Sequence, residues 1–297
     1  MQMRKVWTVL PKPQVKLSRK RQPASGEVQS LLRGLALIEA FCDLDGAAAS
    51  LSELARRTGL SPSTTHRLLA TLQAEGYVTR EADTNHYVLG HRIAGAAATL
   101  QQRTSHLRSL ARPHLEDIAQ TTGETTNLVM LDGRWSVYVD KVEGTHALRM
   151  TMRIGTVFPA HTSASAKAIL AYQPDDSHIA EIFAGALPRK LCKNTIVTAQ
   201  AFKAGLKIIR AKGYAIENEE LEQGVSCIAA PILGPDGTAL AAISVPGPTP
   251  RIMAPNPDRI GLLVRRHAGE VSAALGFTPS DQPPAVAGHA RPSSAGR

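Results

Sequence analysis

The chain is poor in aromatic residues, which make up 4% of its 297 residues. Since hydrophobic residues still reach 43%, the buried cores must be built mainly from Ala, Leu, Val and Ile. Long apolar runs are missing as well: no stretch of about 18 apolar residues occurs, so the sequence predicts no membrane-spanning helix. The basic N-terminus is not followed by an apolar segment, which excludes a secretory signal peptide.

Cysteine is scarce, with Cys42, Cys192 and Cys227 far apart along the chain. No C-x-x-C pair occurs, which argues against a disulfide framework and against a thiolate zinc site. The 10 histidines are scattered without paired ligand spacing, so the sequence predicts neither a metal nor a cofactor. Sparse, unpaired thiols are typical of a reducing compartment, and we expect a cytoplasmic protein.

Acidic residues are missing from residues 1–24, and the formal charge of +9 is largely an effect of the lysines and arginines gathered there. In residues 25–90 acidic residues outnumber basic ones, so a positive face there would need an asymmetric arrangement of charge. We predict that residues 1–24 form a disordered basic tail, and that residues 277–297, rich in Pro, Ala, Gly and Ser, form another. The basic tail is either an arm for DNA phosphates or a solvated tail, and we favour the second interpretation.

One stretch near the N-terminus is typical of two short helices joined by a tight turn. Ser50 and Glu53 have the S-x-x-E spacing of a capping box, so we expect Ser50 to cap the first helix. Gly59 suits the end of that helix. Ser61, followed by a proline that fits the first helical position, then begins the second helix.

The second of these helices has an apolar and a polar face. Its inward stripe has helical spacing and consists of Thr65, Leu68, Leu69 and Leu72. The outer face carries hydroxyls, an imidazole and an arginine, as expected of a helix that reads the major groove with its N-terminal end. Arg67 has the chemistry to pair with guanine O6 and N7. With phosphate contacts from the first helix included, the candidate DNA-binding residues are Ser50, Arg56, Arg57, Ser61, Ser63, Thr64, His66, Arg67 and Thr71.

An ordinary helical hairpin with a solvated polar face would show the same pattern, so the flanking residues matter. Residues 77–80 and 87–89 are β-rich runs around a polar connection, and they predict a hairpin. Residues 28–42 carry a helical apolar stripe that can pack behind the pair of helices. A helix-turn-helix followed by a hairpin is the winged-helix arrangement.

The chain resembles the isocitrate lyase regulator (IclR) family of bacterial transcription factors. The matching segments follow the family's order and are SLLRGLALIEAF, LSELARRTGLSPSTTHRLLATLQAEGYV, YVLGHRI, LARPHLEDIAQTTGET, LDG, VYVDKVEG, LRM, GTVFPAHTSASAKAIL, GYAIENEELEQGVSCIAAPI and ISVPGP. This many motifs in register are more specific than a helix-turn-helix alone. The resemblance implies an α+β fold, with a winged helix-turn-helix in residues 25–90, a linker helix in 91–105 and a GAF-like α/β effector-binding domain in 106–276.

From residue 106 onward the pattern alternates between helices and strands, as in an α+β domain. A helix through 107–118 should be kinked or restarted at Pro113. Strands are predicted at 125–131, 135–142, 148–154, 214–217, 225–233 and 239–245. Helices are predicted at 163–172, 178–183, 199–212 and 260–271.

The resemblance also implies where a small organic acid would bind. Residues 161–167 join a strand to a helix start, where backbone N–H groups favour an anion, although a plain N-cap has the same pattern. By motif position, the implied effector-binding residues are Ala164, Ser165, Glu217, Cys227 and Ser244. The chain departs from the family's keto-acid binders at Ala166, usually Gly, at Glu217, where they have Asp, and at Pro246, often Ser. Lys167 is expected to pair with an acid in a structural role.

Cys227 and His161 together would suggest a thiol nucleophile. However, a cysteine in an apolar strand is more often a small buried hydrophobe, and no oriented base follows from the spacing. We therefore expect a regulator rather than an enzyme, the alternative being a metabolite-binding enzyme with an appended helix-turn-helix. The expected partners are a double-stranded DNA operator, a small organic-acid effector and further copies of the chain in a homodimer or a dimer of dimers, with no membrane partner.

Overall fold

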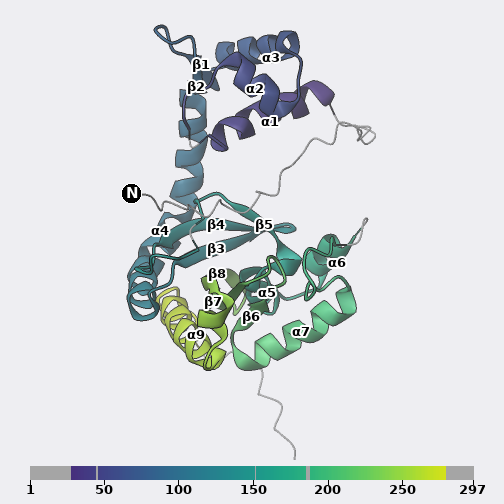
Figure 1. Cartoon of the computed structure of the whole chain (residues 1–297). Helices are drawn as coiled ribbons and strands as arrows, with labels where there is room; N and C mark the ends of the chain where they lie inside the picture. Colours follow the sequence, from purple (N-terminus) through teal and green to yellow (C-terminus); the bar gives the residue numbers. More distant parts are fainter. Residues whose placement is uncertain (1–27, 45, 151, 185–187, 279–297) are drawn as a thin grey trace, which may run out of the picture. The chain divides into compact units, whose positions relative to one another are not determined.

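The computed structural model describes residues 28–44, 46–150, 152–184 and 188–278 (Figure 1). The predicted tail at the N-terminus lies outside this part of the chain. The predicted C-terminal tail lies outside it from residue 279 on, whereas Phe277 is buried against the core. No helix among the described residues is long and apolar enough to cross a bilayer.

The chain divides into two compact units, which meet in the sequence between Arg103 and Thr104. The first unit contains three helices and a hairpin: α1 (Gln29–Cys42), α2 (Leu51–Thr58), α3 (Pro62–Ala74), β1 (Val78–Arg80) and β2 (Tyr87–Leu89). Leu37, Leu54 and Leu69 from the three helices are fully buried together. The predicted winged helix is therefore confirmed.

The helix boundaries of this unit follow from local chemistry. The backbone N–H of Glu53 donates to Ser50 Oγ at 3.2 Å, and that of Thr64 donates to Ser61 Oγ at 3.2 Å. These bonds satisfy donors that the first turn of a helix leaves unpaired. Gly59 ends α2 with φ +68°, a conformation that glycine adopts without a steric cost.

One helix, α4 (His91–Thr122), continues through the boundary between the units. The prediction of a separate helix that restarts at Pro113 is wrong, because Pro113 lies inside an uninterrupted helix, whereas the alternative of a kink at Pro113 stays a prediction. Proline removes one backbone hydrogen bond, but Ala111 and Leu115 on either side are fully buried against the sheet. Packing thus stabilises the helix at the position of the missing hydrogen bond, since tertiary burial supplies most helical stability.

The second unit is built on a six-stranded antiparallel sheet in the order β5-β4-β3-β8-β7-β6 (Figure 1). Its strands are β3 (Thr126–Asp132), β4 (Trp135–Val142), β5 (Val157–Pro159), β6 (Ala215–Asn218), β7 (Val225–Leu233) and β8 (Ala239–Pro248). Its remaining helices are the short 3-10 helix η1 (Ala160–Thr162), α5 (Ala164–Leu170), α6 (Ser177–Phe183), α7 (Ala199–Lys212), α8 (Thr249–Met253) and α9 (Pro257–Ala274).

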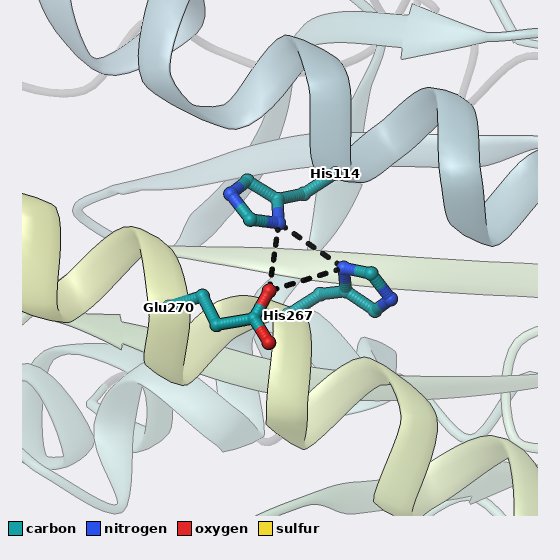
Figure 2. Close-up of side chains that lie close together, drawn as sticks. All are labelled: His114, His267 and Glu270. Atoms are coloured by element: carbon teal, nitrogen blue, oxygen red, sulfur yellow. Dashed lines mark hydrogen bonds and ion pairs between the residues drawn. The ribbon is translucent and has the colours of Figure 1, made fainter.

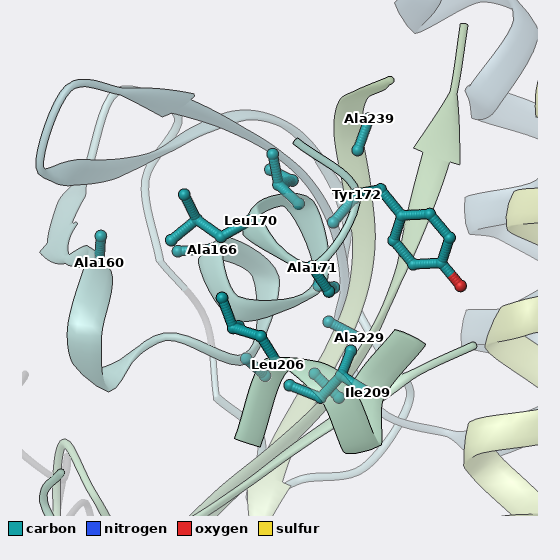
Figure 3. Packing of buried hydrophobic residues seen from close by; sticks show 14 of the residues in the cluster. Ala160, Ala166, Leu170, Ala171, Tyr172, Leu206, Ile209, Ala229 and Ala239 are labelled. Atoms are coloured by element: carbon teal, nitrogen blue, oxygen red, sulfur yellow. The ribbon is translucent and has the colours of Figure 1, made fainter. Parts of the chain in front are cut away.

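Each face of this sheet has its own core. Helices α5, α6 and α7 cover one face, and the later part of α4 with α8 and α9 covers the other. The core under α5 is rich in alanine and contains Ala166 of the helix and Ala229 of the sheet (Figure 3). Ala168 and Ala242 belong to the same core. Small side chains let the helix approach the sheet closely, which accounts for a fully buried α5 in a chain with few aromatic residues.

The strand predicted at residues 148–154 is wrong. The described residues of this segment lie in an irregular connection, and β5 takes the edge of the sheet instead. Leu148 and Ile154 alternate correctly with their neighbours, but both side chains are 54% exposed. An apolar alternation predicts a strand only where one face is buried, and here the segment has no such face.

Candidate functional site

The outer face of α3 presents the polar side chains that the sequence predicted. Thr65 and Leu69 are buried in the core, whereas Ser63, His66, Arg67 and Thr71 are exposed and Thr64 is half-buried. The exposed set combines hydrogen-bonding groups with one cation and contains no acid. Such a face is suited to base edges and phosphates.

Two of the candidate hydroxyls already have structural roles. Ser50 and Ser61 cap α2 and α3, and Ser61 Oγ also lies 2.9 Å from Thr64 Oγ1 and 3.1 Å from Ser63 Oγ. These hydroxyls at the start of α3 therefore orient one another. A DNA contact by Ser50 or Ser61 would have to be made in addition to its capping bond.

The two arginines of α2 share one acid. Glu53 accepts bonds from Arg56 Nη2 and Arg57 Nε, each at 2.6 Å. The hydrogen bonds from Arg56 and Arg57 lower the pKa of Glu53, so this carboxylate stays ionised. Contact with phosphate would require the arginines to share or leave Glu53. The i, i+3 and i, i+4 spacing of these residues in the sequence indicates this pairing.

In the second unit, the strand register brings three of the five implied effector-binding residues onto adjacent strands. Glu217 on β6 lies opposite Cys227 on β7, and Ser244 on β8 lies opposite Ala229. Ala229 belongs to the core under α5, so this set of side chains faces α5. The other two, Ala164 and Ser165, are buried in the first turn of that helix.

The environment of Glu217 combines burial with two backbone donors. Its Oε1 accepts the N–H groups of Glu220 at 2.5 Å and Leu221 at 3.2 Å. Burial nevertheless dominates and raises the pKa of Glu217 to about 7. The carboxyl is therefore poised between its neutral and ionised forms near neutral pH.

Lys167 has the structural role that the sequence predicted. Its ammonium group forms a buried ion pair with Glu220 Oε1. Because Glu220 follows β6 and Lys167 lies in α5, the pair connects the helix to the end of that strand. Removing either partner would leave a buried charge unpaired, which is costly.

Sequence reasoning missed two polar residues in the same region. Asn127 on β3 lies opposite Ser244, and its side-chain amide is buried without a hydrogen-bond partner, whereas the buried Ser244 hydroxyl interacts with the Cys227 thiol. Burial raises the pKa of Tyr138 on β4, and Cys227 and Glu217 add to that rise because they lie nearby. The signal for Asn127 was available, since it is a polar residue directly before the apolar run LVML of its strand.

The thiol–imidazole pair considered in the sequence analysis is not assembled for catalysis. Burial raises the pKa of the Cys227 thiol, so it stays protonated at neutral pH and is a poor nucleophile. His161 Nε2 donates to the carbonyl oxygen of Arg189 at 3.3 Å, and burial lowers the pKa of this histidine. His161 is thus occupied by a structural bond.

Two family models match the chain, and together they span most of it. The model described as IclR helix-turn-helix domain matches residues 30–82. The model described as Bacterial transcriptional regulator IclR C-terminal matches residues 99–273, which is more than half of the chain. The two matches correspond to the winged helix and to the sheet-based unit.

Individual relatives agree with these matches. The Transcriptional repressor IclR of Escherichia coli (strain K12) is 35% identical over 257 residues, covering 86% of this chain and 92% of the repressor. The crystal structure of the Thermotoga maritima IclR has 30% identity and a TM-score of 0.66, and the match covers 84% of this chain and 100% of that one. An IclR homolog from Microbacterium hydrocarbonoxydans, solved in complex with 4-hydroxybenzoate, has 25% identity and a TM-score of 0.67 over 83% of this chain and 99% of that one. The chain therefore belongs to the IclR family of bacterial transcriptional regulators.

Proposed function

We propose that operator binding by this regulator is modulated by a small organic acid that binds between α5 and the sheet. The observation that carries this proposal is the buried side-chain amide of Asn127, which has no hydrogen-bond partner and lies opposite Ser244 on the face of the sheet that also carries Glu217. An unsatisfied buried polar group costs about 1–3 kcal/mol. A ligand with matching polar groups would recover this cost.

The chemistry of the surrounding residues defines the ligand class. The first backbone N–H groups of α5, at Ala164 and Ser165, are suited to a carboxylate. Glu217 can accept a bond from a ligand hydroxyl, and in its protonated form it can donate one. When ionised it would repel a second carboxylate, so we favour a monocarboxylate that carries a hydroxyl or an apolar body over a compact dicarboxylate.

A relative supports this choice of ligand. The Microbacterium hydrocarbonoxydans homolog was solved with 4-hydroxybenzoate, which has one carboxylate, one hydroxyl and an apolar ring between them. The loss of a hydroxyl at Pro246, which lies opposite Cys227, makes the neighbouring wall more apolar than in keto-acid binders. 4-Hydroxybenzoate is therefore the first probe to use, with aliphatic hydroxy acids next.

The DNA-binding part of the proposal rests on α3. We expect Ser63, Thr64, His66, Arg67 and Thr71 to face the major groove, with Arg56 and Arg57 near phosphate. The chain would act as a homodimer or a dimer of dimers, because one winged helix reads few base pairs. A ligand changes DNA affinity only if it binds the DNA-competent and incompetent states unequally.

The test is a ligand screen on the full chain followed by a blocking variant. Binding raises the thermal unfolding midpoint, so 4-hydroxybenzoate and aliphatic hydroxy acids are compared with dicarboxylates. Ser165→Trp fills the buried first turn of α5 and should abolish the shift. A matched control is Ser177→Trp at the exposed start of α6, which should leave the shift unchanged.

DNA binding is then measured on a fragment that the protein itself selects from a random pool. Ser165→Trp should bind this fragment normally but no longer respond to the ligand. A folded Ser165→Trp variant that still responds with normal affinity would place the ligand elsewhere and overturn the proposal. Chemical conversion of a bound ligand would instead favour the enzyme alternative.

A further inference from the structure

Three potential metal ligands meet where α4 and α9 pack together, away from the buried polar residues Asn127, Glu217 and Ser244. Figure 2 shows His114 of α4 directed toward His267 and Glu270 of α9. His267 and Glu270 are three residues apart on one helix, so they lie on the same face. Two imidazoles and one carboxylate form a ligand set that Zn²⁺ uses in proteins.

The distances between the ligand atoms fit one small ion. His114 Nδ1 lies 3.1 Å from His267 Nδ1 and 3.3 Å from Glu270 Oε2, and His267 Nδ1 lies 3.7 Å from Glu270 Oε2. Ligands about 2.0–2.1 Å from Zn²⁺ at tetrahedral positions would be separated by about 3.3–3.4 Å. The three sides of the triangle lie within a few tenths of an ångström of this value.

Without a metal, this group is held by hydrogen bonds whose donors depend on the histidine tautomers. Neutral histidine carries a proton on only one ring nitrogen, and an ionised carboxylate only accepts. Two Nδ1 atoms and one carboxylate oxygen converge on the same point, so hydrogen bonds there require at least one Nδ1 atom to carry a proton. A cation in the centre would interact with all three lone pairs at once.

The groups around His267 support the tautomer that a metal requires. With Nδ1 on the metal, Nε2 carries the proton and can donate to Asp117 Oδ2, which lies 3.2 Å away. A carboxylate behind a ligating histidine is a recurrent arrangement in metal sites. Arg266 Nη2 also lies 3.0 Å from Nε2, but this side chain is 61% exposed and can turn away.

Burial differs among the ligands in a way that suits an accessible site. His267 is buried, so its ring is held in place by the surrounding core. His114 is partly exposed and Glu270 is half-exposed, which leaves room for a water molecule as a fourth ligand. The site thus combines one rigid ligand with an open side.

We propose that His114 Nδ1, His267 Nδ1 and Glu270 Oε2 bind one Zn²⁺ ion per chain. The ion connects α9 to α4 across 153 residues of sequence. A ligand set assembled only in the folded chain stabilises that fold when it binds metal. The scattered histidines showed no ligand spacing in the sequence because the two helices meet only after folding.

The test uses the full chain, stripped with a chelator and kept reduced. Zn²⁺ is titrated against a chromophoric competitor, and thermal unfolding is followed with and without the ion. Wild type should bind one tight equivalent and unfold at a higher temperature with Zn²⁺. His114→Gln and Glu270→Gln should each weaken this binding at least tenfold and remove the stabilisation, while both keep a polar side chain at an accessible position.

Two further variants sharpen the result. His106→Gln, at an exposed position of α4 outside the triad, is the matched control and should bind like wild type. Asp117→Asn weakens the support for His267 and should lower the affinity about tenfold. Co²⁺ in wild type should give the intense visible absorption of a four-coordinate ion, and Glu270→Gln should lose it.

Two results would overturn the proposed zinc site. Wild-type Zn²⁺ affinity in both His114→Gln and Glu270→Gln would assign the ion to another group, such as the thiols of Cys42, Cys192 or Cys227. The proposal would also be overturned if wild type did not bind one equivalent of Zn²⁺. Neither outcome bears on the organic-acid site, because the two sites lie on opposite faces of the sheet.

Discussion

At the scale of single residues, Glu217 connects burial to pH. Its carboxyl accepts two backbone N–H bonds, while the nearby Lys167 pairs with Glu220. Burial outweighs these bonds and raises the pKa of Glu217 from its ordinary value of 4.5 to about 7. The folded chain therefore holds a proton that the unfolded chain releases between these two pH values.

This difference predicts how Glu217 affects the free energy of unfolding. Because its folded-state pKa is raised, its contribution is fully present below about pH 4.5 and is lost as the pH rises through about 7. Glu217→Gln cannot ionise, so its stability does not fall with the ionisation of this side chain. The unfolding midpoint of the variant minus that of wild type should therefore increase from about pH 5 to about pH 8. Glu181→Gln, at an exposed acid of α6, is the control. Parallel pH curves for wild type and Glu217→Gln would contradict the assignment.

A second prediction at this scale concerns Arg67. Its side chain is exposed on α3, and the core residues Thr65 and Leu69 face the other way. Arg67→Ala should therefore fold normally and lose about 1–3 kcal/mol of specific DNA binding. Lys207→Ala, an exposed cation on α7, controls for the change in net charge. Unchanged affinity for the selected operator would remove Arg67 from the interface.

At the scale of elements, local signals were sufficient where a helix end or a turn is set by its own residues. The caps at Ser50 and Ser61, the end of α2 at Gly59 and the residues of α7 could all be predicted from sequence. Leu148–Ile154 shows the limit, since its alternation is local but a strand also needs a partner and a buried face. Pairing across the sheet is a long-range property.

The candidate sites show the same limit. The outer face of α3 followed from helical periodicity, because all its residues lie on one element. Asn127 comes to lie opposite Ser244 only through the order of strands in the sheet, and His114 reaches His267 only through helix packing. No spacing in the sequence indicates that the residues of either pair lie close together. The family resemblance supplied Glu217 and Cys227, which periodicity alone would have left as strand residues.

The helix α4 gives a prediction that separates local from tertiary stability. Pro113 interrupts its hydrogen bonding, while Ala111 and Leu115 anchor it in the core. Pro113→Ala restores a donor and should raise the free energy of unfolding of this unit, by up to about 3 kcal/mol. Denaturant unfolding measures this change. A smaller gain of about 0.5–1 kcal/mol is expected from Gly205→Ala on α7, where an added methyl group meets no atom within 4 Å.

A decrease in stability for Pro113→Ala would have a specific meaning. The core on this side of the sheet would then require the backbone geometry that proline imposes on α4. In that case Gly205→Ala should still stabilise the protein, because it changes a helix on the opposite face. The two variants together distinguish a strained helix from one whose shape is needed for packing.

At the scale of the whole molecule, the proposed regulation requires the two units to act together. The winged helix carries the proposed DNA-binding face of α3, and the sheet-based unit carries the buried polar residues Asn127, Glu217 and Ser244. An acid bound in one unit affects DNA bound by the other only through unequal affinity for two states of the chain. The coupling is reciprocal, so operator DNA should change the affinity for the acid by the same factor.

The last prediction concerns assembly, because a single α3 contacts too few base pairs to select an operator in a genome. Two or four copies of the chain should bind together, and the operator should contain repeated half-sites in a palindromic arrangement. Their centres should be spaced by about 10 bp or a multiple of it, since each recognition helix must enter the major groove on a compatible side of the duplex. Sizing by light scattering at micromolar concentration, with and without the selected DNA, measures the number of chains, and insertion of about half a turn between half-sites should weaken binding. A protein that remains monomeric both free and on DNA, with affinity unaffected by the insertion, would show that one winged helix is sufficient.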